Sequence, residues 1–214
     1  MPLTLVVLIS GRGSNLKAIL DAIDQGSLAA TVSAVISSKA DAPGLEYARQ
    51  HHIDTLALDG NDYPERSKFD IALQGLIDQF NPELVVLAGF MRILSPGFVQ
   101  HFQGHLINIH PSLLPEFCGL NTHQRVIDAG RTEHGASVHF VTEELDGGPL
   151  IAQVRIPVEA GETADQLESR VLEQEHQLYP TVINWIAGNR LQWNNGQILF
   201  DGEPLEEPLM SETV

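Results

Sequence analysis

Residues 5–15 read Leu5-Val6-Val7-Leu8-Ile9-Ser10-Gly11-Arg12-Gly13-Ser14-Asn15, an apolar run that breaks into a glycine turn and then a helical pattern. A continuous apolar run is typical of a strand that is covered on both faces, as in parallel sheets flanked by helices. Glycines before a helix let backbone amides approach an anion, and the helix start adds free N–H groups. The stretch predicts a first core strand followed by an anion-binding turn or by a plain tight turn with a helix cap.

The same alternation of strand and helix continues through the first half of the chain. Three helical segments have proline near their start, where a first helical turn tolerates it. Strand–helix alternation predicts an α/β fold, a Rossmann-like, mostly parallel sheet flanked by helices. The expected strands are residues 4–9, 31–36, 55–58, 84–87 and 106–109, and the expected helices are residues 15–24, 43–51, 64–80 and 96–102.

The second half predicts antiparallel late strands and one long helix. Residues 137–142 and 150–158 flank a short Leu-Asp-Gly-Gly-Pro connection, which suits antiparallel pairing. A capping box, Thr163-Ala164-Asp165-Gln166, opens the long helix. Near the end, residues 192–193 and 198–200 flank a hairpin turn at residues 194–197, and the acidic tail after Pro204 is expected to be loose.

The composition predicts one globular domain over residues 1–214. The chain has 12 Lys and Arg against 28 Asp and Glu, a net charge of -16. Nucleic acid and anionic membranes both attract clustered positive charge, so we expect neither as a partner. The single cysteine, Cys118, cannot form an internal disulfide, and no apolar run approaches the ~20 residues of a spanning helix. Without a signal-peptide pattern, we expect a cytoplasmic protein.

Ligands of such open sheets bind beyond the carboxyl ends of the strands, where the strand order reverses. The turns after the first, fourth and fifth expected strands are therefore the places to look. Residues 88–94, Ala-Gly-Phe-Met-Arg-Ile-Leu, could line a slot for a flat heterocycle or form a buried connection. Asn108 and His110 lie two apart and so share one side of an extended chain. An amide and an imidazole there can stabilise an oxyanion and move a proton.

Two carboxylates have open interpretations. Asp146, in the glycine-rich turn, would favour a charged imidazole if it lay beside one, or it is an ordinary turn aspartate. Glu175 falls on the core-facing stripe of the long helix, so it needs a partner. A ligand hydroxyl, a ligand ammonium, Arg170 or another internal cation could serve.

Several other kinds of site are excluded by their missing motifs. Leu16 stands where a dinucleotide fingerprint has its third glycine, and no Gly-Lys-Ser/Thr occurs, so a monophosphate is the expected anion. His134 and His139 are five apart and point to opposite faces of a strand. With one cysteine and no His-Glu-x-x-His, we expect no metal site. Cys118 has no assignable base, and no Gly-x-Ser-x-Gly elbow is present.

Together the motifs resemble the folate-dependent formyltransferases. Gly-Arg-Gly-Ser-Asn, Ala-Gly-Phe-Met-Arg-Ile-Leu, Asn-Ile-His-Pro-Ser-Leu-Leu-Pro, His-Gly-Ala-Ser-Val-His-Phe-Val and Leu-Asp-Gly-Gly-Pro occur here in that family's order, over residues 4 to about 187. The resemblance implies transfer of a formyl group from 10-formyltetrahydrofolate, a cosubstrate, to the amine of glycinamide ribonucleotide in purine biosynthesis, without a metal. It also implies a monomer or homodimer with only small-molecule partners.

The resemblance also implies roles for particular residues. It implies a phosphate-binding first half over about residues 1–100. A folate-binding and catalytic second half follows over about residues 101–190, before the short hairpin and tail. The implied site residues are Asn108, His110 and Asp146 for catalysis, Gly13, Ser14 and Asn15 for the phosphate, Glu175 for the ribonucleotide, and Arg66, Met91, Arg92, Ile93, Leu94, Thr142, Glu143, Glu144 and Leu145 for the folate.

The chain departs from the family pattern between Glu116 and Gln124. Relatives often have lysine, an aromatic residue, Pro-Gly and a histidine, whereas this sequence has Glu116, Cys118 and Asn121. These changes bear on substrate affinity more than on the reaction. A formyltetrahydrofolate hydrolase, another amine formyltransferase and a non-catalytic nucleotide-binding module remain as alternatives. The first would carry an extra N-terminal domain and a tRNA formyltransferase an extra C-terminal one, and we expect neither here.

Overall fold

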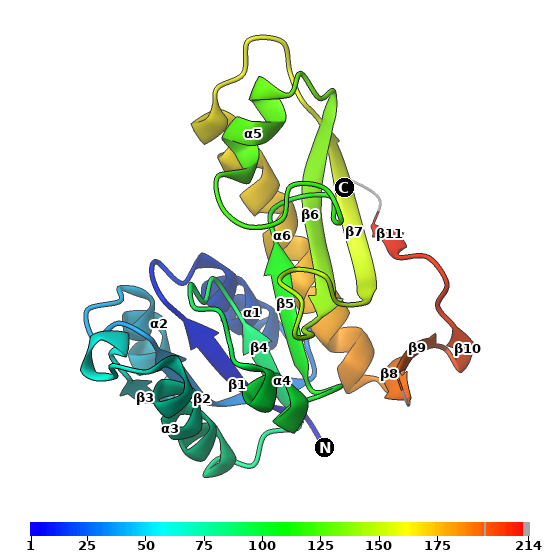
Figure 1. Ribbon diagram of the computed structural model, residues 1–214. Helices are drawn as coiled ribbons and strands as arrows, with labels where there is room; N and C mark the ends of the chain where they lie inside the picture. Colours follow the sequence, from blue (N-terminus) through cyan, green and yellow to red (C-terminus); the bar gives the residue numbers. More distant parts are fainter. Residues whose placement is uncertain (195, 212–214) are drawn as a thin grey trace.

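The computed structural model describes residues 1–194 and 196–211 (Figure 1). Strands and helices alternate through its first half, as the apolar pattern predicts. In chain order the elements are β1 (Leu3–Ile9), α1 (Ser14–Asp24), β2 (Ala30–Ser37), α2 (Gly44–Gln50), β3 (Asp54–Ala57), the short 3-10 helix η1 (Gly60–Asp62), α3 (Arg66–Asp78), β4 (Leu84–Leu87), α4 (Pro96–His101), β5 (Leu106–His110), α5 (Thr122–Asp128), β6 (Glu133–Phe140), β7 (Leu150–Pro157), α6 (Ala164–Ala187), β8 (Leu191–Asn194), β9 (Gln197–Phe200), β10 (Glu203–Pro204) and β11 (Leu209–Ser211).

The main sheet has the strand order β11-β7-β6-β5-β4-β1-β2-β3. Strands β1 to β5 pair in parallel, whereas β6 is antiparallel to both of its neighbours, β5 and β7. This confirms the α/β fold with a mostly parallel sheet and antiparallel late strands. The strand order reverses between β1 and β4, so the turns that follow these two strands border the crevice where such sheets bind ligands.

Helices cover both faces of the sheet, which explains why β1 is apolar at every central position. Leu5 and Val7 pack in one core with α1, α2 and α6, while Val6 and Leu8 pack in the other with α3 and α4. All four side chains are 0% exposed. A strand with water on one face would alternate apolar and polar residues instead.

An arm extends the sheet beyond the ends of the parallel strands. Figure 1 shows β6 and β7 rising past β1 to β4, with α5 and the start of α6 at their far end. Strand β5 connects the two parts, because it pairs with β4 on one side and with β6 on the other. Its carboxyl end therefore lies where the arm meets the base of the molecule.

Several predicted boundaries differ from the structure. Helix α3 begins at Arg66 and not at Pro64, because Glu65 is extended (φ -121°, ψ 132°) and serves as its N-cap. Helix α5 was not predicted, because, unlike the similarly short α2 and α4, it has no proline at its start. Strand β6 begins four residues before the expected position and stops at Phe140, two residues before the expected end.

The C-terminal hairpin is confirmed, but the loose tail is wrong over part of its length. Strands β8 and β9 pair antiparallel, with Asn194 opposite Gln197, around Asn195, which lies outside the described residues. Residues 209–211 form β11, which pairs in parallel with β7. Residues 212–214 also lie outside the described part. Among the residues that the structure describes, no helix is both long and apolar enough to cross a membrane.

Candidate active site

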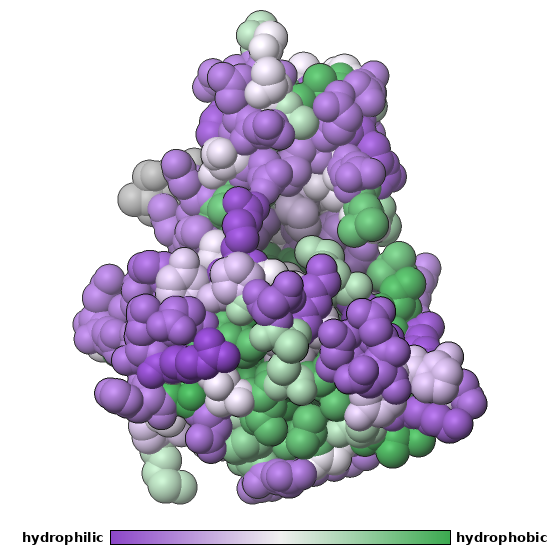
Figure 2. Space-filling view, turned by 90° about the vertical axis from the view of Figure 1, so that its left-hand side faces the viewer, coloured by the Kyte–Doolittle hydropathy of each residue, from purple (hydrophilic) through white to green (hydrophobic). Residues whose placement is uncertain are grey.

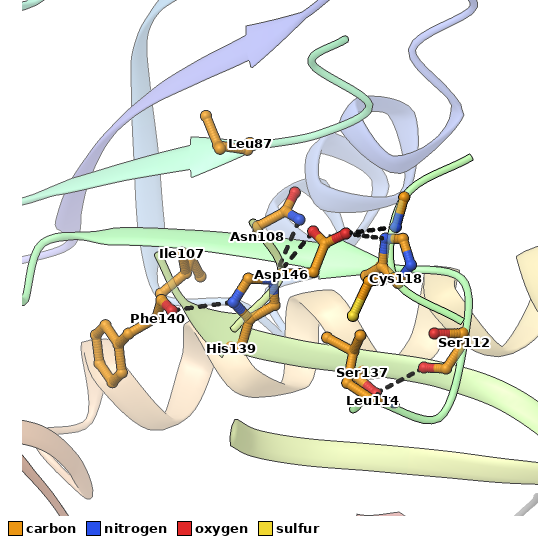
Figure 3. A network of polar contacts seen from close by, with 12 residues as sticks. Leu87, Ile107, Asn108, Ser112, Leu114, Cys118, Ser137, His139, Phe140 and Asp146 are labelled. Carbon is orange, nitrogen blue, oxygen red and sulfur yellow. Dashed lines mark hydrogen bonds and ion pairs between the residues drawn. The ribbon is translucent and has the colours of Figure 1, made fainter. Parts of the chain in front are cut away.

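The structure brings Asn108, His110 and Asp146 together at the carboxyl end of β5. The Nδ1 atom of His110 lies 3.5 Å from Asp146 Oδ2. The other oxygen, Oδ1, lies 4.0 Å from Nε2 of His139, to which the Asn108 amide is hydrogen-bonded at 3.3 Å. In Figure 3, Asn108, Asp146 and His139 point toward one another. An amide donor, two imidazoles and one carboxylate thus form a single cluster.

Asp146 is held rigidly toward these histidines. Its backbone is left-handed (φ 53°), a conformation that aspartate tolerates better than most residues. The Gly119 amide donates to its Oδ2 at 2.9 Å. Two residues on, a Cβ at Gly148 would lie 1.8 Å from the Phe140 carbonyl oxygen, so only glycine fits there. The turn therefore directs the carboxylate into the cluster.

The two ring nitrogens of His110 face different acceptors. Nε2 lies 3.0 Å from the Phe117 carbonyl oxygen, and Nδ1 faces Asp146. Neither a carbonyl nor an ionised carboxylate can donate, so the imidazolium is the form that satisfies both partners. At 3.5 Å the Nδ1–H is not committed to a strong hydrogen bond. It is therefore the donor available to a negatively charged ligand atom, while Nε2 anchors the ring.

His139 is the member of the cluster that the sequence reasoning missed. Its Nδ1 bonds to the Phe140 carbonyl at 2.9 Å, which makes Nδ1 the donor and leaves Nε2 to accept from Asn108. Burial lowers the pKa of His139, although the Phe140 carbonyl and Asp146 oppose this. A neutral His139 thus orients the Asn108 amide. The available signal was the antiparallel register, which places His139 directly opposite Asn108.

His134 belongs to a different environment, as its odd spacing from His139 predicted. Its Nε2 lies 3.0 Å from Nδ1 of His123 on α5, and burial lowers the pKa of His134 to about 4. Within residues 1–194 and 196–211, no three His, Cys, Asp or Glu side chains gather in an arrangement that could hold a metal ion.

The glycine turn after β1 leads directly into α1. Gly13 is left-handed (φ 72°), and a Cβ there would lie 2.7 Å from the Cα of Gly44, at the start of α2. The close approach of the two helix starts therefore requires glycine, whatever the turn binds. Ser14 is the first residue of α1, and no acidic residue lies in that first turn. The positive end of the helix dipole is thus open to an anion.

Asn15 joins this turn to the buried carboxylate of α6. Its Nδ2 donates to Glu175 Oε2 at 2.7 Å, and Glu175 is 6% exposed. Burial raises the pKa of Glu175 to about 7, and the Asn15 bond only partly opposes the rise. The alternative partner is wrong, because Arg170 pairs with Glu162 at 2.9 Å. The Asn15 Oδ1 atom is buried with no hydrogen-bond partner among the described residues.

The loop after β4 alternates exposed and packed side chains. Met91 is 69% and Ile93 57% exposed, whereas Leu94 is buried and Arg92 stacks over the Phe69 ring at 4.1 Å. The guanidinium of Arg66 donates to the Leu94 carbonyl, so Arg66 borders this loop. Of the four loop residues, Met91 and Ile93 are therefore the ones whose side chains are free to contact a ligand.

Two of the ligand-edge segments, the loop after β4 and the turn after β1, lie side by side. The Met91 amide donates to Ser10 Oγ at 2.8 Å, which links the loop after β4 to the turn after β1. Residues 142–145, between β6 and β7, carry Leu145, which is 53% exposed. Figure 2 shows the surface hollowed between the arm and the broader base. Two other grooves, of about 520 Å³ between α1 and α6 and about 670 Å³ near Gly104 and Trp193, lie away from the Asn108–His110–Asp146 cluster.

The segment that departs from the family pattern is tied to the arm. Glu116 forms an ion pair with Arg131, so its charge is partly neutralised at the mouth of the site. Arg125 donates to the Cys118 carbonyl at 2.7 Å. Asn121 is left-handed (φ 58°) and is the N-cap residue of α5. Glu116 and Cys118 therefore have local partners, whereas the Asn121 side chain makes no capping hydrogen bond.

The fold and the side chains gathered at the end of β5 suit an enzyme that transfers formyl groups, and comparison with known proteins shows that class. Residues 3–183 match the formyl transferase family, so the chain belongs to that family. It is a transferase.

The names of the individual relatives specify the type of formyltransferase. It is 52% identical to phosphoribosylglycinamide formyltransferase of Escherichia coli (strain K12), over 95% of this chain and 96% of that protein. The structure of phosphoribosylglycinamide formyltransferase from Coxiella burnetii matches with a TM-score of 0.94 at 50% identity, covering 98% and 99% of the two chains. The trifunctional purine biosynthetic protein adenosine-3 of Bos taurus is 43% identical over 91% of this chain and 19% of its own length.

Proposed function

We propose that this chain transfers the formyl group of 10-formyltetrahydrofolate to the amine of glycinamide ribonucleotide, as a cytoplasmic step of purine biosynthesis. The observation that carries the proposal is the joining of Asn108, His110 and Asp146 at the edge that also holds the open N-terminus of α1. The names of the most similar relatives support the choice of substrate.

The proposed reaction is an acyl transfer through an oxyanion. The substrate amine attacks the formyl carbon, and the carbonyl electron pair moves onto oxygen. The Asn108 amide and the Nδ1–H of charged His110 stabilise that oxygen. Such electrostatic stabilisation is usually the largest single contribution to lowering the activation barrier. The bond between the formyl carbon and the folate nitrogen then breaks, while the proton lost by the amine ends on the departing nitrogen. The Asp146 carboxylate, 3.5 Å from His110 Nδ1, stabilises the positive charge of the imidazolium.

In this proposal the two substrates approach from different halves of the chain. The turn at residues 13–15 binds the phosphate through backbone amides, and Glu175 binds a ribonucleotide hydroxyl. Met91 and Ile93 flank the folate with their side chains, whereas Arg92 and Leu94 contribute backbone groups. Residues 142–145 close the other side of the folate, and Arg66 contacts its outer part. The active protein is a monomer or a homodimer.

Ser14→Asp tests the phosphate site without endangering the fold. A carboxylate in the first helical turn interacts favourably with the α1 dipole and so keeps the helix stable, but it repels a bound phosphate. Two unit charges about 4 Å apart repel by roughly 1–4 kcal/mol, so the KM for the ribonucleotide should rise at least about fivefold. Ser14→Asn has the same shape without the charge and is the control. A KM that rises equally in both variants, or a matching rise for the folate, would place the phosphate elsewhere.

Glu175→Gln should separate stability from substrate binding. The unfolded carboxyl releases its proton near 4.5 and the folded one near 7, so the folded state binds the extra proton in between. The free energy of unfolding should therefore fall as pH rises through that window, by about 3 kcal/mol. Glutamine has no proton to release, so its free energy of unfolding, measured with urea, should depend less on pH. The variant should be more stable than the wild-type protein at alkaline pH.

The same variant should bind the ribonucleotide less well, because its NH2 group replaces one of the two carboxyl oxygens while the remaining oxygen is engaged by the Asn15 amide. Its KM for the folate should stay unchanged. Parallel pH slopes for the wild-type protein and Glu175→Gln would contradict the buried, protonated carboxyl.

A comparison of acceptors tests the proposed substrate. Absorbance monitors deformylation of the folate. This reaction should require glycinamide ribonucleotide and should not proceed with charged initiator tRNA. Full-rate deformylation without an amine acceptor would support the hydrolase alternative. Binding of the nucleotide without any turnover would support a non-catalytic module.

A further inference from the structure

A second set of polar side chains is buried beside the catalytic cluster, under the loop that joins β5 to α5. Ser112 and Ser137 are 0% exposed, and Gln153 of β7 is 6% exposed. Burying such groups costs free energy unless each finds hydrogen-bond partners. Here most of the partners are backbone atoms of residues 112–116.

Ser137 uses the whole capacity of its hydroxyl. Its Oγ donates to the Ser112 carbonyl at 2.6 Å and accepts from the Leu114 amide at 3.0 Å and from Gln153 Nε2 at 2.8 Å. A hydroxyl has one donor and two lone pairs, so no capacity is left. Figure 3 shows the bond between Ser137 and Ser112.

Gln153 and Ser112 fix two further carbonyl groups of the loop. The Gln153 Nε2 atom also donates to the Leu114 carbonyl at 2.8 Å, so both of its N–H groups are used. The Ser112 Oγ donates to the Glu116 carbonyl at 2.7 Å. Three carbonyls and one amide of residues 112–116 are thus bound by buried side chains, and the backbone there has little freedom to move.

The next residue, Phe117, connects this loop to the active site. The Phe117 carbonyl is the partner of His110 Nε2, at 3.0 Å. The direction of that carbonyl follows from the backbone just before it. Because Nε2 anchors the ring, the same carbonyl determines the direction of Nδ1–H, which faces Asp146 at 3.5 Å.

We propose that Ser137 and Gln153 are positioning residues for formyl transfer. They hold residues 112–116, place the Phe117 carbonyl on His110 Nε2, and so aim Nδ1–H at the developing oxyanion. This inference rests on the proposed role of His110. Both side chains are buried under the loop, so their removal should slow the chemical step and leave substrate binding largely intact.

The test compares Ser137→Thr with Ser137→Val in the full-length chain. The two side chains have the same shape and differ only by the hydroxyl, so any crowding is common to both. The valine variant should have a kcat lower than that of the threonine variant by roughly tenfold to a hundredfold, as expected for a misaligned catalytic group. KM values for both substrates should agree within about threefold. Gln153→Leu should behave like the valine variant.

Two further measurements separate positioning from simple loss of stability. Ile156→Val weakens packing on the same strand β7 without touching the loop, and it should keep the wild-type kcat. The His110 ring-nitrogen NMR shifts, assigned by their absence in His110→Asn, should change at Nε2 in Ser137→Val and stay unchanged in Ile156→Val.

Equal kcat values for the threonine and valine variants would overturn the inference. So would an unchanged Nε2 shift, or an equal kcat loss in Ile156→Val. If the wild-type protein fails to formylate glycinamide ribonucleotide, the proposed function is wrong, and the ring-nitrogen comparison still decides whether the network positions His110.

Discussion

Asp146→Asn should lower kcat by roughly 10²–10⁴, the range for lost acid–base assistance, with little change in either KM. Asparagine preserves the shape, tolerates the left-handed backbone and can still accept from the Gly119 amide. It removes the charge that faces His110 at 3.5 Å. The charged imidazole is then less favoured, so the loss should appear in the transition state and not in substrate binding.

Steady-state kinetics with each substrate varied in turn measure this effect, and thermal unfolding checks that the variant is folded. A kcat within a few fold of wild type would make Asp146 a turn residue only. A loss confined to KM would make it a binding group.

Asn108→Asp should lower kcat by roughly 10²–10³, the cost of one oxyanion donor. Aspartate has the same shape as asparagine but no N–H, and it adds negative charge where the oxyanion develops. The residue is half-buried at the end of β5, and its partner His139 can donate to the new carboxylate once protonated. The fold should therefore survive, and the KM values should change less than kcat. Normal turnover would remove Asn108 from the mechanism.

Exchanging the two residues provides a sharper control. The double variant Asn108→Asp/Asp146→Asn has the wild-type charge and the same set of functional groups, in exchanged places. If the site needed only one carboxylate near the histidines, the exchange would restore activity. We expect the double variant to be no faster than the slower single variant, because each group acts through its position.

The parts of the fold that follow from local pattern could be predicted from the sequence. The apolar run of β1 indicated a strand covered on both faces, and α1, α6, α3 and α4 do cover it. The spacing of Asn108 and His110 also placed them on one side of β5. Both conclusions need only the two-residue period of a strand and the pattern of apolar residues along it.

The rest depends on pairing and packing between distant segments. His139 joins the cluster only because β6 pairs with β5 in one register, and a shift of one residue would turn it away. The partner of Glu175 lies on another helix, at Asn15, so the helical stripe alone could not separate it from Arg170. Gly13 is needed for contact with Gly44, a reason that neither interpretation of the glycine turn included.

In the proposed function, one formyl group passes from the folate to the ribonucleotide amine. The most direct measurement gives the wild-type protein 10-formyltetrahydrofolate with an isotopically labelled formyl group, together with glycinamide ribonucleotide, and quantifies both products by mass spectrometry. We expect one labelled formyl-ribonucleotide for each folate consumed and no labelled formate. Labelled formate released while the ribonucleotide stays unmodified would contradict the claim.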